Sequence, residues 1–420
     1  MLKAIFFIQL LIVVSLNKHK FQKINTIFIN SYSFGHSVIE STVFFETFGV
    51  NGLCLSVGNK ENRNYYFKDI FKPNILIHFW IPNVKTLVFY QAIRKRVHEV
   101  IEVSMQNSKL IKLIIGKNLT SINRDLLLEN VAKLKLVKNF GLSEKKATEV
   151  IAKFQSDFRK ANNNHSSALQ LIAQQESYIS LDLPYSLSKL NQRFKYNLEK
   201  LAGNYKSEEV KICTLILRKS HKAWSGMGIH GYKQIIEYLR KKQYIICIVG
   251  DVSEFINSRN DPAFFGVYDH NDFDLDDKSF QLLSIFNSQF CIGDQSGAQT
   301  IVHFIGKKNL ILNTIPMGQN QFNTVCLPQI WKDQEGRKVS TEKHLNQLFL
   351  QYQPLKLSNN KVLTPNLNEP SVVLATVKNF VEGAEQNNIK YISQSEKIFD
   401  IEYFSKYTQS GGFAPEFFKI

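Results

Sequence analysis

Residues 291–319 have the sequence CIGDQSGAQTIVHFIGKKNLILNTIPMGQ, which predicts a strand, a tight Ser-Gly turn, a short helix and a second strand. A helix that opens at Ser296 and Gly297 presents unpaired backbone N–H groups and the positive end of its dipole. In α/β sheets this end lies beside the carboxyl edge of the preceding strand, where phosphorylated ligands bind. The stretch therefore predicts an anion-binding turn that suits a nucleotide diphosphate.

The length of the chain, 420 residues, exceeds what one hydrophobic core usually holds and predicts two domains. Its 52 basic and 36 acidic side chains give a formal charge of +16, which favours an anionic partner. The lysines are spread along the whole chain and accompany no zinc-finger, RRM or basic-zipper spacing. Nucleic acid is therefore not an expected partner.

The five cysteines are widely spaced, and several lie inside apolar runs. Because they form no CxxC pair and no cluster with histidine at ligand spacing, we expect reduced core residues and no structural zinc. The acidic residues between Asp269 and Asp277 lack the glycine and the terminal glutamate of an EF-hand, so a calcium site is not expected. A serine hydrolase is disfavoured because no glycine lies two residues before Ser296.

Residues 4–16 form an almost wholly apolar run that is followed by Lys18, His19, Lys20 and Lys23. As a helix this run would rise only about 20 Å, short of the roughly 30 Å hydrocarbon core of a bilayer. A cleaved secretory signal is one interpretation. We favour a segment that packs in the membrane interface or against the domain, with residues 1–23 making peripheral contact with anionic lipid.

The elements that follow have the order of an open α/β sheet. A loop over residues 31–36 and a helix that begins after it are predicted to follow the first strand. A second helix is predicted over 84–100. The predicted strands are 24–30, 52–57, 74–80 and 109–115.

Helical segments rich in Lys, Gln, Asn and Ser extend over about 142–205 and lead to a second alternating pattern. Its first strands are predicted at 211–217 and 244–249, with a helix over 232–242 between them and a closing helix over 370–382. The sequence thus predicts an α/β protein with two Rossmann-like domains that face a cleft. The expected divisions are 1–16, 17–205, 206–385 and a tail over 386–420.

Polar residues follow four successive strands of the second domain, at the edge where parallel sheets form their binding sites. They are Arg218 and Lys219 after the first strand, Gly250 and Asp251 after the second, Asp269 in the next loop, and Ser296 and Gly297 after the strand centred on Phe290.

Arg218 would bind phosphate through its forked guanidinium, with Lys219 as a point charge nearby; the alternative for Arg218 is an ordinary surface ion pair. Asp251 would bind a ribose hydroxyl or act as a base, or it would simply cap a helix. His221 and Trp224, in the loop after Arg218, would contact a base or a sugar.

In the first domain Gly35 and His36 lie in the loop after the first strand. His36 would position a sugar or take a proton near neutral pH, or it would only stabilise the loop. Glu40, four residues later, would orient His36 or remain a solvated carboxylate in the first turn of the helix.

Together these motifs resemble a family of bacterial glycosyltransferases of the GT-B type, associated with surface-polysaccharide genes and marked by an amino-terminal Gly-His loop. The resemblance spans most of the chain. The motifs are residues 34–36 with Glu40, 213–218, 229–232, 244–251, 269–270, 293–297, 313–316 and 366–370.

The resemblance implies transfer of a sugar from a nucleotide-sugar donor to a glycan or lipid-linked acceptor, in the cytoplasm or at the inner face of the membrane. It implies no cofactor besides this donor, and no metal. The first domain would present the acceptor and the second would bind the donor, with Gly35, Glu40, His221 and Trp224 as the acceptor-binding residues. His36 and Asp251 would be catalytic, and Arg218, Lys219, Gly250, Asp269, Ser296 and Gly297 would bind the donor.

Two positions depart from the family pattern. Ile229-His230 replaces an Arg-Asn pair, and Ile248 replaces an arginine in the strand before Gly250. The loss of these cations leaves two alternatives open: a catalytically degenerate glycan-binding or membrane-surface protein of the same fold, and a nucleotide-sugar epimerase.

Overall fold

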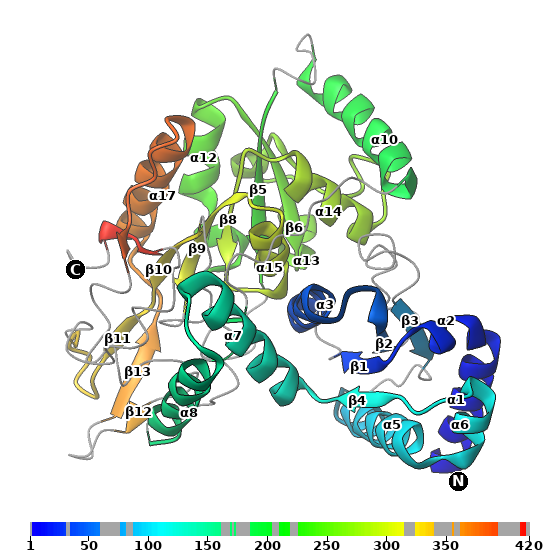
Figure 1. The fold of residues 1–420 in the computed structure, drawn as a ribbon. Helices are drawn as coiled ribbons and strands as arrows, with labels where there is room; N and C mark the ends of the chain where they lie inside the picture. Colours follow the sequence, from blue (N-terminus) through cyan, green and yellow to red (C-terminus); the bar gives the residue numbers. More distant parts are fainter. Residues whose placement is uncertain are drawn as a thin grey trace. The chain divides into compact units, whose positions relative to one another are not determined.

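The computed structural model of the chain divides into two compact units, Met1–Leu134 and Lys135–Ile420, and each contains a parallel β-sheet with helices packed on it (Figure 1). The predicted α/β class with two Rossmann-like domains is confirmed. The structure describes residues 2–30, 34–58, 76–80, 87–160, 169, 172–173, 185–203, 210–218, 226–314, 324–339, 355–356, 362–393 and 412–416.

The first unit contains a four-stranded sheet in the order β3-β2-β1-β4, in which every neighbouring pair is parallel. Its strands are β1 (Thr26–Asn30), β2 (Gly52–Gly58), β3 (Leu76–Trp80) and β4 (Thr120–Ile122). Its helices are α1 (Leu2–Leu16), α2 (Lys18–Lys23), α3 (Phe34–Phe48), α5 (Leu87–Asn107) and α6 (Lys109–Ile115), and α7 (Arg124–Phe140) leads into the second unit.

Helix α1 belongs to the core of the first unit. Phe6, Leu10 and Val14 are buried in one hydrophobic cluster with residues of α5 and α6, among them Val97 and Ile111. Because these three side chains recur every four residues, they form one side of the helix. The apolar run over residues 4–16 is therefore packed against the domain, one of the arrangements that the sequence predicts. Among the described residues, no helix has the length and apolar character needed to span a bilayer.

Two predictions for the first unit are wrong. Residues 109–115 form helix α6, because the Ser108 side chain accepts a hydrogen bond from Ile111 N and Gly116 ends the helix with a positive φ of 81°. The predicted loop over residues 31–36 is also shorter than expected. Helix α3 begins at Phe34, so Gly35 and His36 lie in its first turn.

The second unit is built on an eight-stranded sheet in the order β14-β15-β10-β9-β8-β5-β6-β7. Its neighbours are parallel except for the pair β14 and β15. The strands are β5 (Lys211–Leu217), β6 (Tyr244–Gly250), β7 (Val267–Tyr268), β8 (Phe290–Asp294), β9 (Lys308–Thr314), β10 (Thr324–Pro328), β14 (Ile392–Ser393) and β15 (Gly412–Phe413).

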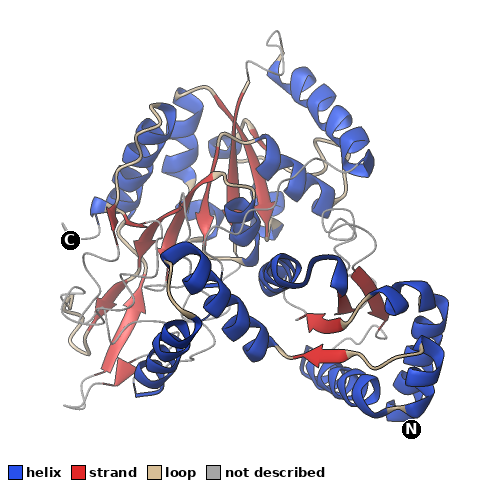
Figure 2. Cartoon of the chain, in the orientation of Figure 1, coloured by secondary structure: helices blue, strands red, loops and turns tan. Residues whose placement is uncertain are grey.

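Helices flank this sheet on both sides (Figure 2). The start of one of them is set by its cap: Asp276 caps α14 by accepting hydrogen bonds from Lys278 N and Ser279 N. The helices are α8 (Glu144–Lys160), α10 (Tyr185–Ala202), α11 (Gly228–Gly231), α12 (Lys233–Lys241), α13 (Ser253–Ser258), α14 (Asp277–Asn287), α15 (Gly297–Phe304) and α17 (Pro370–Glu385).

The order of the six parallel strands from β5 to β10 places a switch point in the sheet. Numbered from β5 onward, their order across the sheet is 3-2-1-4-5-6. The chain proceeds from β5 to β6 and β7 on one side, then returns to β8 on the other side. In open α/β sheets, ligands bind in the crevice at the carboxyl ends of the two strands that flank such a point. Here those strands are β5 and β8.

Two glycines allow close backbone approach at this edge. A Cβ atom on Gly250 would lie 2.2 Å from the Leu217 carbonyl oxygen, and one on Gly293 would lie 2.2 Å from the Ile216 carbonyl oxygen. Gly250 also has a φ of +94°, which side-chain-bearing residues rarely adopt. Both sides of β5 are thus in close backbone contact with glycine.

Helix α10 packs within the second unit. Its Phe194 ring stacks on Phe273 at a centroid distance of 4.6 Å. Its Asn197 side chain donates to the Phe273 carbonyl oxygen at 2.7 Å, and Asn191 accepts from Asn287. Whereas the sequence predicts a domain boundary after residue 205, the compact units divide after Leu134.

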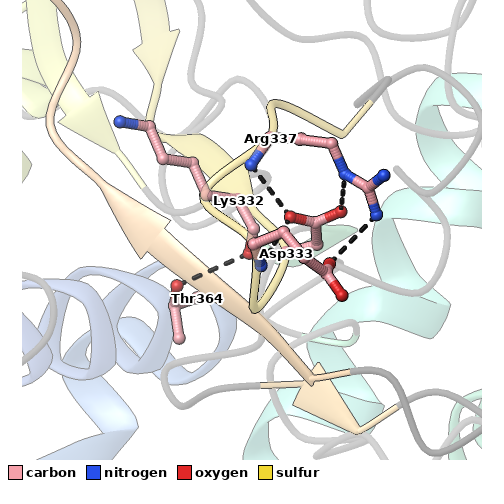
Figure 3. A network of polar contacts seen from close by, with 5 residues as sticks. Lys332, Asp333, Arg337 and Thr364 are labelled. Atoms are coloured by element: carbon pink, nitrogen blue, oxygen red, sulfur yellow. Dashed lines mark hydrogen bonds and ion pairs between the residues drawn. The ribbon is translucent and has the colours of Figure 1, made fainter.

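A small antiparallel sheet in the order β11-β13-β12 completes the second unit, with β11 (Ile330–Lys332), β12 (Leu355–Lys356) and β13 (Val362–Asn366). The turn after β11 is organised by Asp333, which accepts hydrogen bonds from Arg337 N at 2.8 Å and Arg337 Nε at 2.9 Å (Figure 3). Thr364 of β13 donates to the Lys332 carbonyl oxygen. Arg337 is an exposed arginine of this turn and does not belong to the parallel sheet.

The carboxyl-terminal segment also joins the large sheet. Phe413 and Ala414 are fully buried, and β15 pairs with β10 on one side and β14 on the other. The sequence predicts a flexible terminus at Gly411 and Gly412. This prediction is wrong for Gly412, which is part of β15.

We predict that Gly250→Ala destabilises the protein more than Gly336→Ala does. Both glycines have positive φ, but a Cβ atom on Gly336 would have nothing within 4 Å. We expect a loss of about 1–2 kcal/mol for Gly336→Ala from backbone strain alone. Gly250→Ala should lose roughly 1–3 kcal/mol more, because the Leu217 carbonyl must move. Urea unfolding measures both, and equal losses would contradict the steric role of Gly250.

Candidate functional site

The polar groups at the switch point converge from the ends of β5 and β8. Arg218 directly follows β5, and its Nη1 donates to the Gln295 carbonyl oxygen at 2.7 Å. Its backbone N–H donates to Asp294 Oδ2 at 3.2 Å. Asp294 is the last residue of β8, three residues before the first residue of α15. The guanidinium of Arg218 is therefore held beside the segment that opens α15.

Asp294 ties together both ends of the chain segment that follows β5. Its carboxylate is only 2% exposed and also accepts from Met227 N at 3.3 Å. Gly226 fits against this carboxylate, because a Cβ atom there would lie 2.2 Å from Asp294 Oδ2 and 2.5 Å from the Arg218 carbonyl oxygen. The residues at both ends of this segment, Arg218 and Met227, are thus hydrogen-bonded to one buried carboxyl group.

Glu254 makes a similar contact with the next residues. Its Oε2 atom accepts from Ile229 N at 3.3 Å. Gly228 has a φ of +62°, and a Cβ atom there would lie 2.7 Å from the same oxygen. Two carboxylates from different elements therefore hold the backbone of residues 226–229 in place.

Burial raises the pKa of Asp294 to about 7. The hydrogen bonds from Arg218 N and Met227 N, the nearby Tyr232 hydroxyl and the charge of Arg218 oppose this rise. The loss of hydration exceeds their combined effect, since the ionised form of a carboxyl group is the one that burial penalises. Near neutral pH, the protonated and ionised forms of this carboxyl group are therefore both populated.

The amino terminus of α15 has features of an anion site. Ser296 is the N-cap residue, with φ −149° and ψ 169°, but its side chain makes no capping hydrogen bond. Among the described residues, the buried Ser296 Oγ and Gln299 Oε1 atoms have no hydrogen-bond partner. Gln299 is fully buried, and its Nε2 donates to the Asp294 carbonyl oxygen at 3.4 Å. Several groups that can bind an anion thus lie at the carboxyl edge of the sheet: the first-turn N–H groups of α15, the Ser296 hydroxyl and Arg218.

The structure brings Arg218, Ser296 and Gly297 together as the sequence predicts.

Gly250 and Asp251 lie at the end of β6, the strand next to β5. There Asp251 N donates to the Leu217 carbonyl oxygen at 3.2 Å. The Asp251 carboxylate accepts from Ser253 N and from Ser253 Oγ at 2.7 Å. In this structure the carboxylate stabilises the turn that leads into α13.

Asp269 is fully buried in a turn after β7. Its Oδ1 atom accepts from Asn271 N at 2.8 Å, and its Oδ2 atom lies 3.7 Å from Arg259 Nη1. Asp272 pairs with the same arginine and accepts from Asp269 N. The Asp269 carboxylate is thus engaged inside this turn.

In the first unit Glu40 is 1% exposed and forms an ion pair with Arg124 at 2.9 Å between Oε1 and Nε. This contact joins α3 to the start of α7, and Glu40 is not the solvated carboxylate of the alternative prediction. Gly35 and His36 lie in the first turn of α3. Lys219, His221 and Trp224, and the side chain of His36, lie outside the described residues.

Asp294 and Glu254 are site residues that the sequence analysis does not select. The available signal for Asp294 is a charged residue at the last position of an otherwise wholly uncharged, buried strand. For Glu254 the signal is weaker, because a carboxylate in the first turn of a helix is ordinary. Within the described segments, no group of three His, Cys, Asp or Glu side chains has an arrangement that could hold a metal ion.

Comparison with solved structures finds sugar transferases. One is E. coli ADP-heptose LPS heptosyltransferase II, with a TM-score of 0.41 and 8% identity over 72% of this chain and 90% of that chain. A family 9 glycosyl transferase from Veillonella parvula has a TM-score of 0.41 and 10% identity, with 72% and 86% of the two chains covered. An E. coli heptosyltransferase with ADP-2-deoxy-2-fluoro heptose has a TM-score of 0.40 and 10% identity over 72% and 92%.

These neighbours belong to the class of enzymes that the sequence resembles. No protein-family model matches the chain, and no curated protein matches it.

We predict that Asp294 makes the stability of the protein fall between pH 5 and pH 7. A carboxyl group with a pKa of about 7 in the folded state, above the ordinary value, binds more protons when folded than when unfolded. Stability therefore falls as pH rises through this interval and levels off above it. From pH 5 to pH 8, the free energy of unfolding of the unsubstituted protein should fall by about 2–3 kcal/mol relative to that of Asp294→Asn, which lacks the titrating carboxyl group.

Urea unfolding at pH 5, 6, 7 and 8 measures this difference. Asp333→Asn is the matched control, because Asp333 is an aspartate of the surface turn after β11 whose pKa is lowered by Arg337. Its difference from the unsubstituted protein should stay constant over the same range. A constant difference for Asp294→Asn as well would show that the buried carboxyl group does not titrate in this interval.

Proposed function

We propose that the protein is a glycosyltransferase that binds the diphosphate of a nucleotide-sugar between the carboxyl ends of β5 and β8. One observation carries this proposal: Arg218 and the amino terminus of α15 meet at the switch point of a sheet with strand order 3-2-1-4-5-6. The Ser296 hydroxyl, which has no hydrogen-bond partner in the part of the chain that the structure describes, lies at the same place.

The chemistry of sugar transfer requires stabilisation of the negative charge that develops on the departing nucleotide diphosphate. Arg218 supplies a permanent positive charge, and its hydrogen bond to the Gln295 carbonyl oxygen fixes its position. The first turn of α15 supplies backbone N–H donors and a favourable dipole. We propose that these groups bind the diphosphate without a metal ion.

The buried carboxyl group of Asp294 is compatible with an anion beside it. With a pKa of about 7, it is largely neutral in slightly acidic conditions and only half ionised near neutral pH. A bound diphosphate would favour the protonated form further, because like charges disfavour ionisation. Asp294 then acts as a positioning residue that holds Arg218 and residues 226–227.

The residues proposed for the acceptor and for catalysis come from the sequence motifs. We propose that His36 and Asp251 act in catalysis, and that His221 and Trp224 contact the acceptor. Gly250, Asp269 and Lys219 complete the proposed donor residues, and Gly35 and Glu40 the acceptor residues. The proposed acceptor is a glycan or a lipid-linked sugar used in surface-polysaccharide synthesis, at the cytoplasmic side of the membrane.

A nucleotide-binding protein without turnover is the second candidate, and one observation favours it. The family pattern has an Arg-Asn pair where this chain has Ile229 and His230, and an arginine where it has Ile248. Both isoleucines are buried apolar residues. His230 is exposed and its ring lies 5.9 Å from that of Phe264. These positions therefore add no permanent positive charge to the site.

We predict that Arg218→Ala weakens nucleotide-diphosphate binding by about 10- to 100-fold, the range for losing one charge-assisted hydrogen bond. Calorimetric titration with ADP, UDP, GDP, CDP and dTDP, and with their sugar conjugates, identifies the ligand and measures the loss. Arg337→Ala is the matched control, because Arg337 lies in the surface turn after β11. It should leave the affinity unchanged.

Binding of none of these nucleotides, or equal loss in both variants, would contradict the proposed donor site. Binding followed by transfer to an acceptor supports the transferase, whereas interconversion of the free nucleotide-sugar identifies an epimerase. Binding without either reaction identifies the degenerate protein.

A further inference from the structure

Helix α1 has an exposed side that is as apolar as its buried side. Phe6, Leu10 and Val14 are buried in the core, but four other aliphatic side chains of the helix are between 49% and 75% exposed. They are Ile5, Ile8, Ile12 and Leu16. Their spacing of three, four and four residues places them on one side of the helix. A single exposed aliphatic residue is ordinary, but a continuous row is not.

Helix α6 repeats this arrangement beside α1. The two helices lie side by side in the first unit (Figure 1). Ile111 and Ile115 of α6 are buried in the same cluster as the inner side of α1, whereas Leu110 and Leu113 are exposed, Leu113 by 78%. Both helices therefore turn aliphatic side chains away from one shared core. We call the six exposed residues of α1 and α6 the apolar face.

The segments that bear the apolar face, residues 1–39 and 103–124, contain basic side chains and no acidic ones. Lysine occurs in α1, in α2, in α6 and shortly after α6, at Lys3, Lys18, Lys20, Lys23, Lys109, Lys112 and Lys117. The sequence contains no Asp or Glu before Glu40, and none between Glu102 and Asp125. Lys117 donates to a neutral side-chain oxygen, that of Asn25, at 3.1 Å. Each of these two segments therefore carries a formal positive charge.

Exposed aliphatic side chains beside several lysines favour one kind of partner. A second copy of the chain, docked through the same face, would bring two sets of lysines together, and α1, α2 and α6 contain no carboxylate to place between them. An anionic lipid surface accepts both features, since exposed aliphatic side chains enter the boundary between headgroups and acyl chains while lysines meet the lipid phosphates. Because the inner side of α1 belongs to the protein core, the helix would lie in the plane of the membrane surface.

We propose that the apolar face and its lysines attach the first unit to the surface of an anionic membrane. The attachment uses side chains that are not part of the nucleotide site, so it stands independently of the proposed sugar transfer. If that transfer is also correct, attachment holds the enzyme at the surface where a lipid-linked acceptor would be.

Cosedimentation with vesicles tests the proposal on the full chain. The unsubstituted protein should bind vesicles of phosphatidylcholine with phosphatidylglycerol, and bind pure phosphatidylcholine much more weakly. Lys18→Gln, Lys23→Gln and Lys109→Gln combined should weaken binding to the anionic vesicles by about fivefold per lysine. The control combines Lys145→Gln, Lys153→Gln and Lys195→Gln, three exposed lysines of α8 and α10, and should bind nearly as the unsubstituted protein does.

The aliphatic part is tested by Ile8→Asn with Ile12→Asn, and separately by Leu113→Asn. These side chains are exposed, so the variants should keep their thermal unfolding temperature and nucleotide affinity while losing vesicle binding. Ile256→Asn, at a residue of α13 that is 46% exposed, is the control and should retain binding.

Three results would overturn the proposal: no vesicle binding by the unsubstituted protein, unchanged binding by the α1 and α6 variants, or equal loss in the control variants. Size-exclusion chromatography adds a fourth. A dimer that dissociates in Ile8→Asn with Ile12→Asn would assign the face to a second copy of the chain. None of these results bears on nucleotide binding, which Arg218→Ala tests.

Discussion

The carboxyl group of Asp294 is the contact on which the candidate site depends. It lies at the end of β8 and accepts hydrogen bonds from the backbone N–H groups of Arg218 and Met227. These bonds connect the end of β5 with the start of α11, across a distance of 76 residues in the sequence for Arg218. Arg218 is thereby positioned to contact the Gln295 carbonyl oxygen. Without this carboxyl group, the segment after β5 would lose the partner of both its ends.

Such a contact is possible only because the surrounding backbone leaves room for it. Gly226 lies against the Asp294 carboxylate, and Gly293 lies against the backbone of β5, where a Cβ atom would overlap the Ile216 carbonyl oxygen. The same tight packing removes water from Asp294 and raises its pKa. Close packing, the position of Arg218 and the proton affinity of the carboxyl group are thus consequences of one arrangement at the switch point of the sheet.

Much of the second unit could be predicted from the sequence, because its signals are local. The continuous apolar run of β5 predicts a strand buried on both faces, and residues 211–217 form that strand. Asp276 predicts the start of α14, and Ser296 with Gly297 predicts the start of α15. The five cysteines are free and buried, as expected. In each case the deciding residues lie within one element or its cap.

The first unit shows where local signals fail. The segment KLIKLII over residues 109–115 has an apolar pattern that suits a strand or a helix, and capping by Ser108 and Gly116 decides for α6. Glu40 also could not be assigned from sequence, since its partner Arg124 belongs to an element more than 80 residues later.

By itself, the sequence determined the α/β class, most element positions and the turn at Ser296 and Gly297, because periodicity and capping act over a few residues. Only the tertiary structure decided that β5 and β8 lie side by side, that Asp294 faces the segment after Arg218, and which side of α1 is exposed. The physical reason is that a buried polar group, or an apolar helix side, takes its environment from elements far away in the chain.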